Sequence, residues 1–169
     1  YIEVGAGYSR AINERLTVGG KAKLLLGAGN INLKINQIQM SGRGIGYESE
    51  FQLKSDAYME ASAKGLKLEE EDGYITDLDY NSLGISGYGA GIDLGATYQV
   101  MKNLNVSAAI LDLGFISWDK SNSQVAESDR NATINKDNYS DDVLDFNLFG
   151  LKKKENKSRT TSLSPTMVI

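Results

Sequence analysis

The sequence predicts an all-β fold: an antiparallel, up-and-down transmembrane β-barrel, to which the chain contributes about six or seven strands, with long loops on one rim. Three observations lead to this prediction. Long segments alternate between apolar and polar residues, connections are short on one edge of the expected sheet and long on the other, and tyrosines stand near the ends of the apolar rows. Glycine occurs 18 times and proline once, which suits long, twisted strands.

The N-terminal part alternates in three segments, 1–9, 16–26 and 31–35, separated by a polar link at 10–15 and a turn at 27–30. In the first two segments one parity is apolar and consists of Ile2, Val4, Ala6, Tyr8, Leu16, Val18, Ala22, Leu24 and Leu26. Lys21 and Lys23 have the opposite parity, so the other face needs water nearby. We expect three strands that follow one another as hairpins.

The longest alternation runs from Gly87 to Val100, where seven apolar residues on one face of the strand alternate with glycines and polar residues on the other. Residues 101–103 form a tight turn, and the apolar row resumes over 104–110. Soluble strands are usually much shorter, at about 5–6 residues. Between the hairpins, segment 47–64 alternates weakly and is a less regular strand.

Connection lengths favour a barrel of the outer-membrane type. The links near 10–15, 41–46 and 101–103 are short and fall on one edge of the sheet. The other edge carries the short turn near 27–30 but also the acidic stretch 65–84 and the polar stretch 119–158. Outer-membrane barrels have short periplasmic turns and long extracellular loops. We expect 119–158 to be a long polar loop with a short helix within 141–154, where apolar residues crowd an acidic-to-basic segment.

The chain opens in mid-strand without an export signal, so we expect residues 1–169 to be part of a single barrel domain truncated at both ends. On the apolar parity, Tyr8 and Tyr98 precede short links, and Tyr88 lies ten residues before Tyr98, which corresponds to roughly 25 Å of apolar band. Together with Trp118, these tyrosines are the expected aromatic girdle. The opposite parity supplies the expected lumen-lining residues, which are Lys21, Lys23, Asp93, Thr97, Gln99, Asn105 and Ser107.

Composition excludes several classes of function. Cysteine and histidine are absent, which removes disulfides, zinc and haem sites and histidine-based relays, so we expect no metal, no cofactor and no enzyme. The formal charge of -4 leaves no basic surface for nucleic acid. No run of about 18 apolar residues that would form a spanning helix is present.

One carboxylate pair is a candidate for acid/base catalysis. Asp93 and Asp112 lie at similar levels on adjacent strands, but Asp112 has the apolar parity unless a bulge shifts the register. With a bulge, both face the lumen, where Lys21 or Lys23 pairs with them, and a structural role is favoured over acid/base catalysis. The glycines at 87, 89, 91 and 95 favour strand curvature over room for a solute.

The segments 1–27, 91–98 (Gly-Ile-Asp-Leu-Gly-Ala-Thr-Tyr) and 110–118 (Ile-Leu-Asp-Leu-Gly-Phe-Ile-Ser-Trp) resemble an uncharacterised outer-membrane β-barrel family of Bacteroidota. Its members are similar in style to the barrels that transport long-chain fatty acids. The resemblance covers most of residues 1–118, and 162–169 resembles the start of a further strand. The resemblance implies a β-barrel fold, a location in the outer membrane and further strands before and after this segment. It assigns no activity to particular residues.

The functional hypothesis is a channel or transporter for an unidentified solute in the bacterial outer membrane, with the lipid bilayer as its surroundings. A second hypothesis is a structural or assembly component of a cell-surface or secretion complex, which binds a partner protein through 65–84 and 119–158. A third is a soluble β-sandwich or ligand-binding barrel, with the apolar parity turned inward. Solute-dependent current through the full-length protein in planar bilayers distinguishes the first hypothesis from the second. A requirement of the full-length protein for detergent distinguishes both from the third.

Overall fold

The protein is all-β and antiparallel in its computed structural model, which describes residues 1–44, 50–71, 73–82, 84–134 and 150–169. This confirms the predicted fold class at the level of secondary structure and strand direction. The described residues form twelve strands and one 3-10 helix, in three open sheets and without a closed barrel. None of these described segments is a helix long and apolar enough to cross a membrane. The chain divides into two compact units, and each unit is assembled from segments that are far apart in the sequence.

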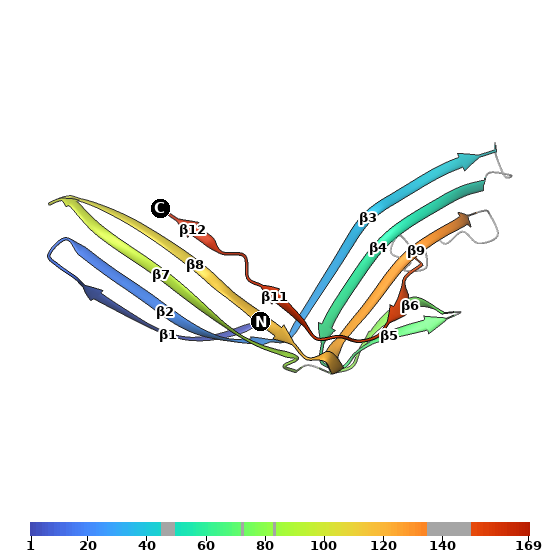
Figure 1. Ribbon diagram of the computed structural model, residues 1–169, viewed down its shortest axis with the longest axis horizontal. Helices are drawn as coiled ribbons and strands as arrows, with labels where there is room; N and C mark the ends of the chain where they lie inside the picture. Colours follow the sequence, from blue (N-terminus) through green and yellow to red (C-terminus); the bar gives the residue numbers. More distant parts are fainter. Residues whose placement is uncertain (45–49, 72, 83, 135–149) are drawn as a thin grey trace. The chain divides into compact units, whose positions relative to one another are not determined.

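The first unit comprises Tyr1–Gly29, Ile85–Asp119 and Ser158–Ile169. Its strands are β1 (Ile2–Ala11), β2 (Leu16–Gly27), β7 (Gly87–Met101), β8 (Leu104–Trp118), β11 (Arg159–Ser162) and β12 (Thr166–Val168). They pair in the order β1-β2-β7-β8, and β8 then pairs with both β11 and β12. Figure 1 shows β1, β2, β7 and β8 side by side.

The register of this sheet brings the alternating apolar residues onto one face. Leu24 of β2 lies between Val4 of β1 and Ala90 of β7, and Ala90 lies opposite Phe115 of β8. This face is open, since 64% of Leu24 and 61% of Tyr88 are exposed. The exposed apolar row is defined by Val4, Tyr8, Leu24, Tyr88, Ile92, Leu94, Tyr98, Val106, Ile110 and Phe115. A small buried cluster of Leu25, Ile116 and Trp118, with Leu163 packed against it, has the opposite parity.

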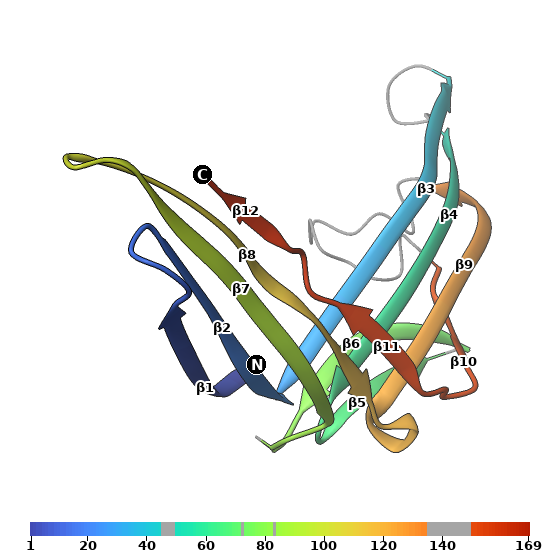
Figure 2. The same ribbon diagram turned by 60° about the vertical axis from the view of Figure 1, so that its left-hand side comes forward.

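The second unit comprises Asn30–Gly84 and Lys120–Lys157. Its elements are β3 (Gly29–Arg43, which begins at the boundary), β4 (Glu50–Ala63), β5 (Leu66–Glu71), β6 (Tyr74–Tyr80), the 3-10 helix η2 (Lys120–Asn122), β9 (Ser123–Ile134) and β10 (Lys152–Lys154). Four strands pair in the order β10-β9-β4-β3, and β5 pairs with β6 in a separate hairpin. Figure 2 shows β3, β4 and β9 running alongside one another.

The second unit buries its apolar side chains under its own hairpin. Leu66 and Leu68 alternate with exposed Lys67, so one side of β5 is apolar. The hairpin turns at Gly73, whose φ of 79° lies in the left-handed region that glycine adopts without strain. The Ile75 amide donates to the Leu151 carbonyl at 2.8 Å. The resulting core consists of Ala57, Met59, Leu68, Ile75, Ala126 and Leu151.

Serine pairs explain why polar segments form strands here. The Ser62 and Ser123 hydroxyls are 2.8 Å apart, those of Ser55 and Ser128 are 2.9 Å apart, and both pairs are buried between β4 and β9. Cross-strand hydroxyl pairs stabilise a sheet without an apolar row. The prediction that 119–158 is a long loop is therefore wrong for β9 and β10, and 65–84 is largely a hairpin. Residues 141–149 of the segment expected to form a helix lie outside the described residues, and Lys152–Lys154 of that segment form β10.

Strand order also differs from the up-and-down prediction. β2 pairs with β7, which is 60 residues further along, and the 27–30 link leads from the first unit to the second instead of closing a hairpin. Pairing of β2 with β7 brings Asp93 to 2.6 Å from the Lys23 ammonium, and this ion pair stabilises the observed strand order. The twelve described strands exceed the six or seven expected because the polar stretches contain strands as well.

Candidate functional site

A cluster of five charged side chains lies on the face of the first unit opposite the exposed apolar row. The Lys23 ammonium lies 2.6 Å from Asp93 Oδ1, 2.7 Å from Asp112 Oδ1 and 3.4 Å from Glu3 Oε2. Lys21 forms an ion pair with the other oxygen of Glu3. Only 5% of the Lys23 side chain is exposed, so its three carboxylate partners compensate for the lost hydration.

A β-bulge places Asp112 in this cluster. Ile92 pairs with Leu113 and Leu94 pairs with Ile110, so Leu111 and Asp112 together lie opposite Asp93. Asp112 has a φ of 61°, in the left-handed region, and its amide donates to Asp93 Oδ1 at 2.8 Å. Of the two alternatives that the sequence left open, the one with a bulge is present, and Asp93 and Asp112 share a face.

The arrangement of the cluster favours a structural role for the two aspartates. Lys23 lies between both carboxylates and contacts each of them. A carboxylate pair that acts on glycosides has one protonated member and an open space between the groups for the substrate or water. Here a lysine occupies that position, so the geometry corresponds to an ion-paired link between β2, β7 and β8.

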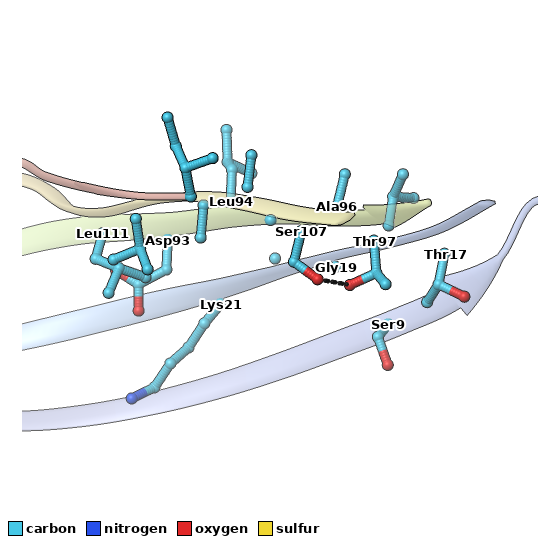
Figure 3. A pocket seen from close by; sticks show the side chains of 17 residues that line it. Ser9, Thr17, Gly19, Lys21, Asp93, Leu94, Ala96, Thr97, Ser107 and Leu111 are labelled. Atoms are coloured by element: carbon cyan, nitrogen blue, oxygen red, sulfur yellow. Dashed lines mark hydrogen bonds between the residues drawn. The ribbon is translucent and has the colours of Figure 1, made fainter. Parts of the chain in front are cut away.

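The remaining predicted lumen residues lie on the same face, towards the β7–β8 turn. The hydroxyls of Thr97 and Ser107 are 2.9 Å apart, and Gln99 lies opposite Asn105. Figure 3 shows Lys21, Thr97 and Ser107 on one side of the sheet, with Leu94 and Ala96 pointing to the other. A shallow hollow of about 540 Å³ runs along these strands and is lined by residues of both parities, such as Ser9 and Thr17 on one hand and Val18 and Leu94 on the other.

Glycines on this face allow close approach rather than opening space for a solute. A Cβ at Gly89 would lie 2.0 Å from the Phe115 carbonyl oxygen on β8. At Gly27 a Cβ would lie 2.7 Å from the Trp118 ring. At Gly95, in contrast, a Cβ would make only ordinary contacts, at 3.5 Å. The close approach at Gly89 agrees with the curvature interpretation for that part of β7.

The aromatic residues divide between the two faces. Tyr8, Tyr88 and Tyr98 are exposed on the apolar face, as the sequence pattern predicts. The prediction for Trp118 is wrong, because only 3% of this residue is exposed and it lies on the opposite face. The bulge at Leu111–Asp112 reverses the parity of the rest of β8, so Phe115 takes the exposed position instead.

Two features near this face were missed in the sequence. Trp118 Nε1 donates to Thr161 Oγ1 at 2.9 Å, and the Arg159 guanidinium lies 5.8 Å from the centre of the Trp118 ring. Both contacts join β8 to β11, a segment too short to show alternation. Glu3 was missed as a cluster member although its polar parity on β1 was visible, which was the available signal.

A polar groove of about 860 Å³ lies in the second unit and had no counterpart in the sequence predictions. Tyr58 of β4, Glu127 of β9 and Lys152 of β10 follow one another in register across three strands. Burial raises the pKa of the Tyr58 phenol, and its hydrogen bond to Glu60 at 2.7 Å raises that pKa further, so the phenol keeps its proton at neutral pH. The hydrogen bond from Lys157 to this phenol is the main cause of a raised pKa for the Lys157 ammonium.

Comparison with known proteins identifies a family without a known activity. A family of unknown function, DUF5723, matches residues 1–169. No curated protein and no solved structure matches the chain. The expectation of an uncharacterised family is confirmed, whereas its outer-membrane location and its bacterial group stay predictions. The match spans all of the chain, which therefore belongs to the DUF5723 family of unknown function.

Proposed function

We propose that the first unit forms part of the wall of a bacterial outer-membrane β-barrel, and that this barrel conducts or transports a small solute. The observation that carries the proposal is the distribution of side chains on its sheet. The exposed apolar row occupies one face across four strands, while Lys23 is buried among carboxylates on the other. A soluble sheet buries its apolar face, whereas a barrel wall turns that face to lipid and its polar face to the lumen.

Strand length supports the same proposal. β7 and β8 have 15 residues each, and β2 has 12. About 9–11 tilted residues cross the hydrocarbon core of a bilayer. Tyr88 and Tyr98 are both exposed on the apolar face of β7 and are ten residues apart. This spacing matches the two interfacial girdles of an apolar band roughly 25 Å high.

The opposite face has the chemistry of a wetted lumen wall. It carries the charged cluster together with Thr97, Gln99, Asn105 and Ser107, and it contains three carboxylates and two lysines. Rings of charged side chains bias ion passage by their sign. Side chains of both signs suit a pore for polar solutes better than a site for one highly charged ion.

Planar-bilayer conductance of the whole protein tests this proposal. We expect discrete current steps, and we expect Lys21→Glu to increase the preference for cations because it removes a positive charge and adds a negative one on the lumen face. Lys67→Glu, an identical charge change in the second unit, is the control and leaves ion preference unchanged. A protein that inserts into the bilayer without any current contradicts the transport function.

A structural or assembly role is the second candidate, and the second unit favours it. This unit packs its own core beneath the β5–β6 hairpin and presents a polar groove. A barrel that conducts no solute but co-purifies with a partner protein, and loses that partner when the β5–β6 hairpin is replaced by a short turn, supports assembly over transport.

A further inference from the structure

The polar groove of the second unit has the composition of a ligand site. Its walls carry three lysines, Lys34 on β3 and Lys152 and Lys154 on β10, while Asp56 and Glu127 lie on the strands between them. The outer strands of the four-stranded sheet thus supply the cations and the inner strands supply the carboxylates. The volume of about 860 Å³ is within the range of about 300–1,000 Å³ typical of small-molecule sites.

Contacts within the walls hold several of these side chains in place. The Asn36 amide donates to Asp56 at 3.2 Å, and the Lys154 ammonium lies 3.6 Å from Glu127. The Lys152 ammonium lies 4.9 Å from the centre of the Tyr74 ring. These side chains are mutually positioned around the groove, which lowers the entropy lost when a ligand binds.

The balance of donors and acceptors indicates the class of ligand. Lysine ammonium groups donate only, carboxylates accept only, and amides and phenols do both. A ligand with many hydroxyl groups satisfies such a mixture, because each hydroxyl donates and accepts. The apolar part of the lining is limited to Ala57, Gly150 and tyrosine rings, so a lipid tail or an apolar peptide side chain finds no pocket.

The charge of the groove favours a single acidic group on that ligand. Three lysines outnumber two carboxylates, and the lysines lie at the outer strands. A ligand with one carboxylate pairs with an outer lysine while its hydroxyls reach the inner carboxylates. Nucleic acid, with a phosphate at every residue, meets Asp56 and Glu127 unfavourably.

We propose that this groove binds an acidic oligosaccharide, a short sugar chain with an isolated carboxylate. The inference goes beyond the proposed channel, because all the groove residues belong to the second unit and none of them depends on where the first unit lies.

Titration calorimetry of the whole protein with matched sugars tests this inference. The probes are cellobiouronic acid and neutral cellobiose, which differ in one carboxylate, and inorganic phosphate as a simple anion. We expect the acidic sugar to bind about tenfold more tightly than cellobiose, as a charge-assisted hydrogen bond implies. Because the single carboxylate pairs with one outer lysine, we expect one of the two variants Lys152→Gln and Lys34→Gln to weaken binding of the acidic sugar about fivefold. Lys67→Gln, outside the groove, should leave that binding unchanged.

Each other outcome counts against the inference. Equal binding of the two sugars contradicts the role of the lysines. Equal binding of phosphate and the acidic sugar identifies a simple anion site. The proposal is overturned if no probe binds at millimolar concentration while the far- and near-ultraviolet circular dichroism signals show that the protein is folded. The proposed channel function is not affected by that result.

Discussion

The two units of this protein use the same alternating pattern in opposite ways. In the first unit the apolar face is open, with Leu24 64% exposed, and a lysine is buried on the other face. In the second unit the core residues of β4 and β9 pack against the β5–β6 hairpin, and Ile75 of that hairpin is completely buried. Alternation therefore predicts a two-faced strand, but the presence or absence of a covering layer decides which medium the apolar face requires.

Substitution of Trp118 is expected to have the largest effect on the first unit. Trp118→Ala should lower the free energy of unfolding by about 3–5 kcal/mol, because the ring fills the space above Gly27 and Gly87. Phe115→Ala, three residues earlier on the open face, should cost less since it leaves no cavity. Urea unfolding in detergent measures both. Equal losses would show that the two faces of β8 are equally packed.

In the second unit, Ile75→Ala should cost about 2–5 kcal/mol, because Ile75 lies at the centre of the hairpin core. This loss should be the same in detergent and in lipid vesicles, since the core is made of protein alone. Hydrogen exchange of amides in β4 and β9 reports on this unit separately. A loss that depends on the lipid would remove the distinction between a self-covered sheet and a lipid-covered one.

In the first unit, Ile92→Arg should impair insertion into vesicles by about 2–4 kcal/mol if it lies near the bilayer midplane. Thr97→Arg, on the same strand but on the polar face, should be much milder. A folding titration from detergent into lipid compares the two variants. The assignment of the faces fails if both variants cost the same.

A smaller effect is expected from the close approach of β7 to β8. Gly89→Ala should cost about 1–3 kcal/mol, because the added methyl group meets the Phe115 carbonyl oxygen at 2.0 Å and the strands must separate. Gly95→Ala, on the same face of the same strand, should be nearly neutral because its nearest contact is at 3.5 Å. Urea midpoints distinguish them, and equal midpoints would argue against tight curvature at Gly89.

Local sequence patterns predicted the main strands of the first unit. The alternating segments predicted β1, β2, β7 and β8 and the two faces of each strand. They also indicated the bulge at Asp112, because Leu113 and Phe115 restart the apolar row one residue late. The partnership of Asp93 and Asp112 with a β2 lysine followed from parity, although sequence left Lys21 and Lys23 as alternatives. In the structure Lys23, which is diagonal to Asp93 in the register, contacts both aspartates, whereas Lys21 pairs with Glu3.

The alternation pattern could not predict which distant strands pair or that polar segments form strands. Nothing local to β2 shows that its partner is β7, because 59 residues lie between the two strands and contacts such as Lys23–Asp93 form only in the folded sheet. β9 has no apolar row, and its serines are typical of a loop in the sequence. Their partners on β4, Ser62 directly opposite Ser123 and Ser55 diagonal to Ser128, are visible only in the folded sheet. The groove depends on four strands at once and was invisible for the same reason.

Cysteine scanning of β7 tests the central claim, that the exposed apolar row faces lipid, most directly. The chain contains no cysteine, so single cysteines at positions 92 to 97 carry a spin label uniquely within it. In lipid vesicles we expect accessibility to oxygen to be high at Ile92, Leu94 and Ala96, and accessibility to a water-soluble nickel reagent to be high at Asp93, Gly95 and Thr97. The opposite phase, or a monodisperse detergent-free monomer that buries the even-numbered positions, would contradict the account.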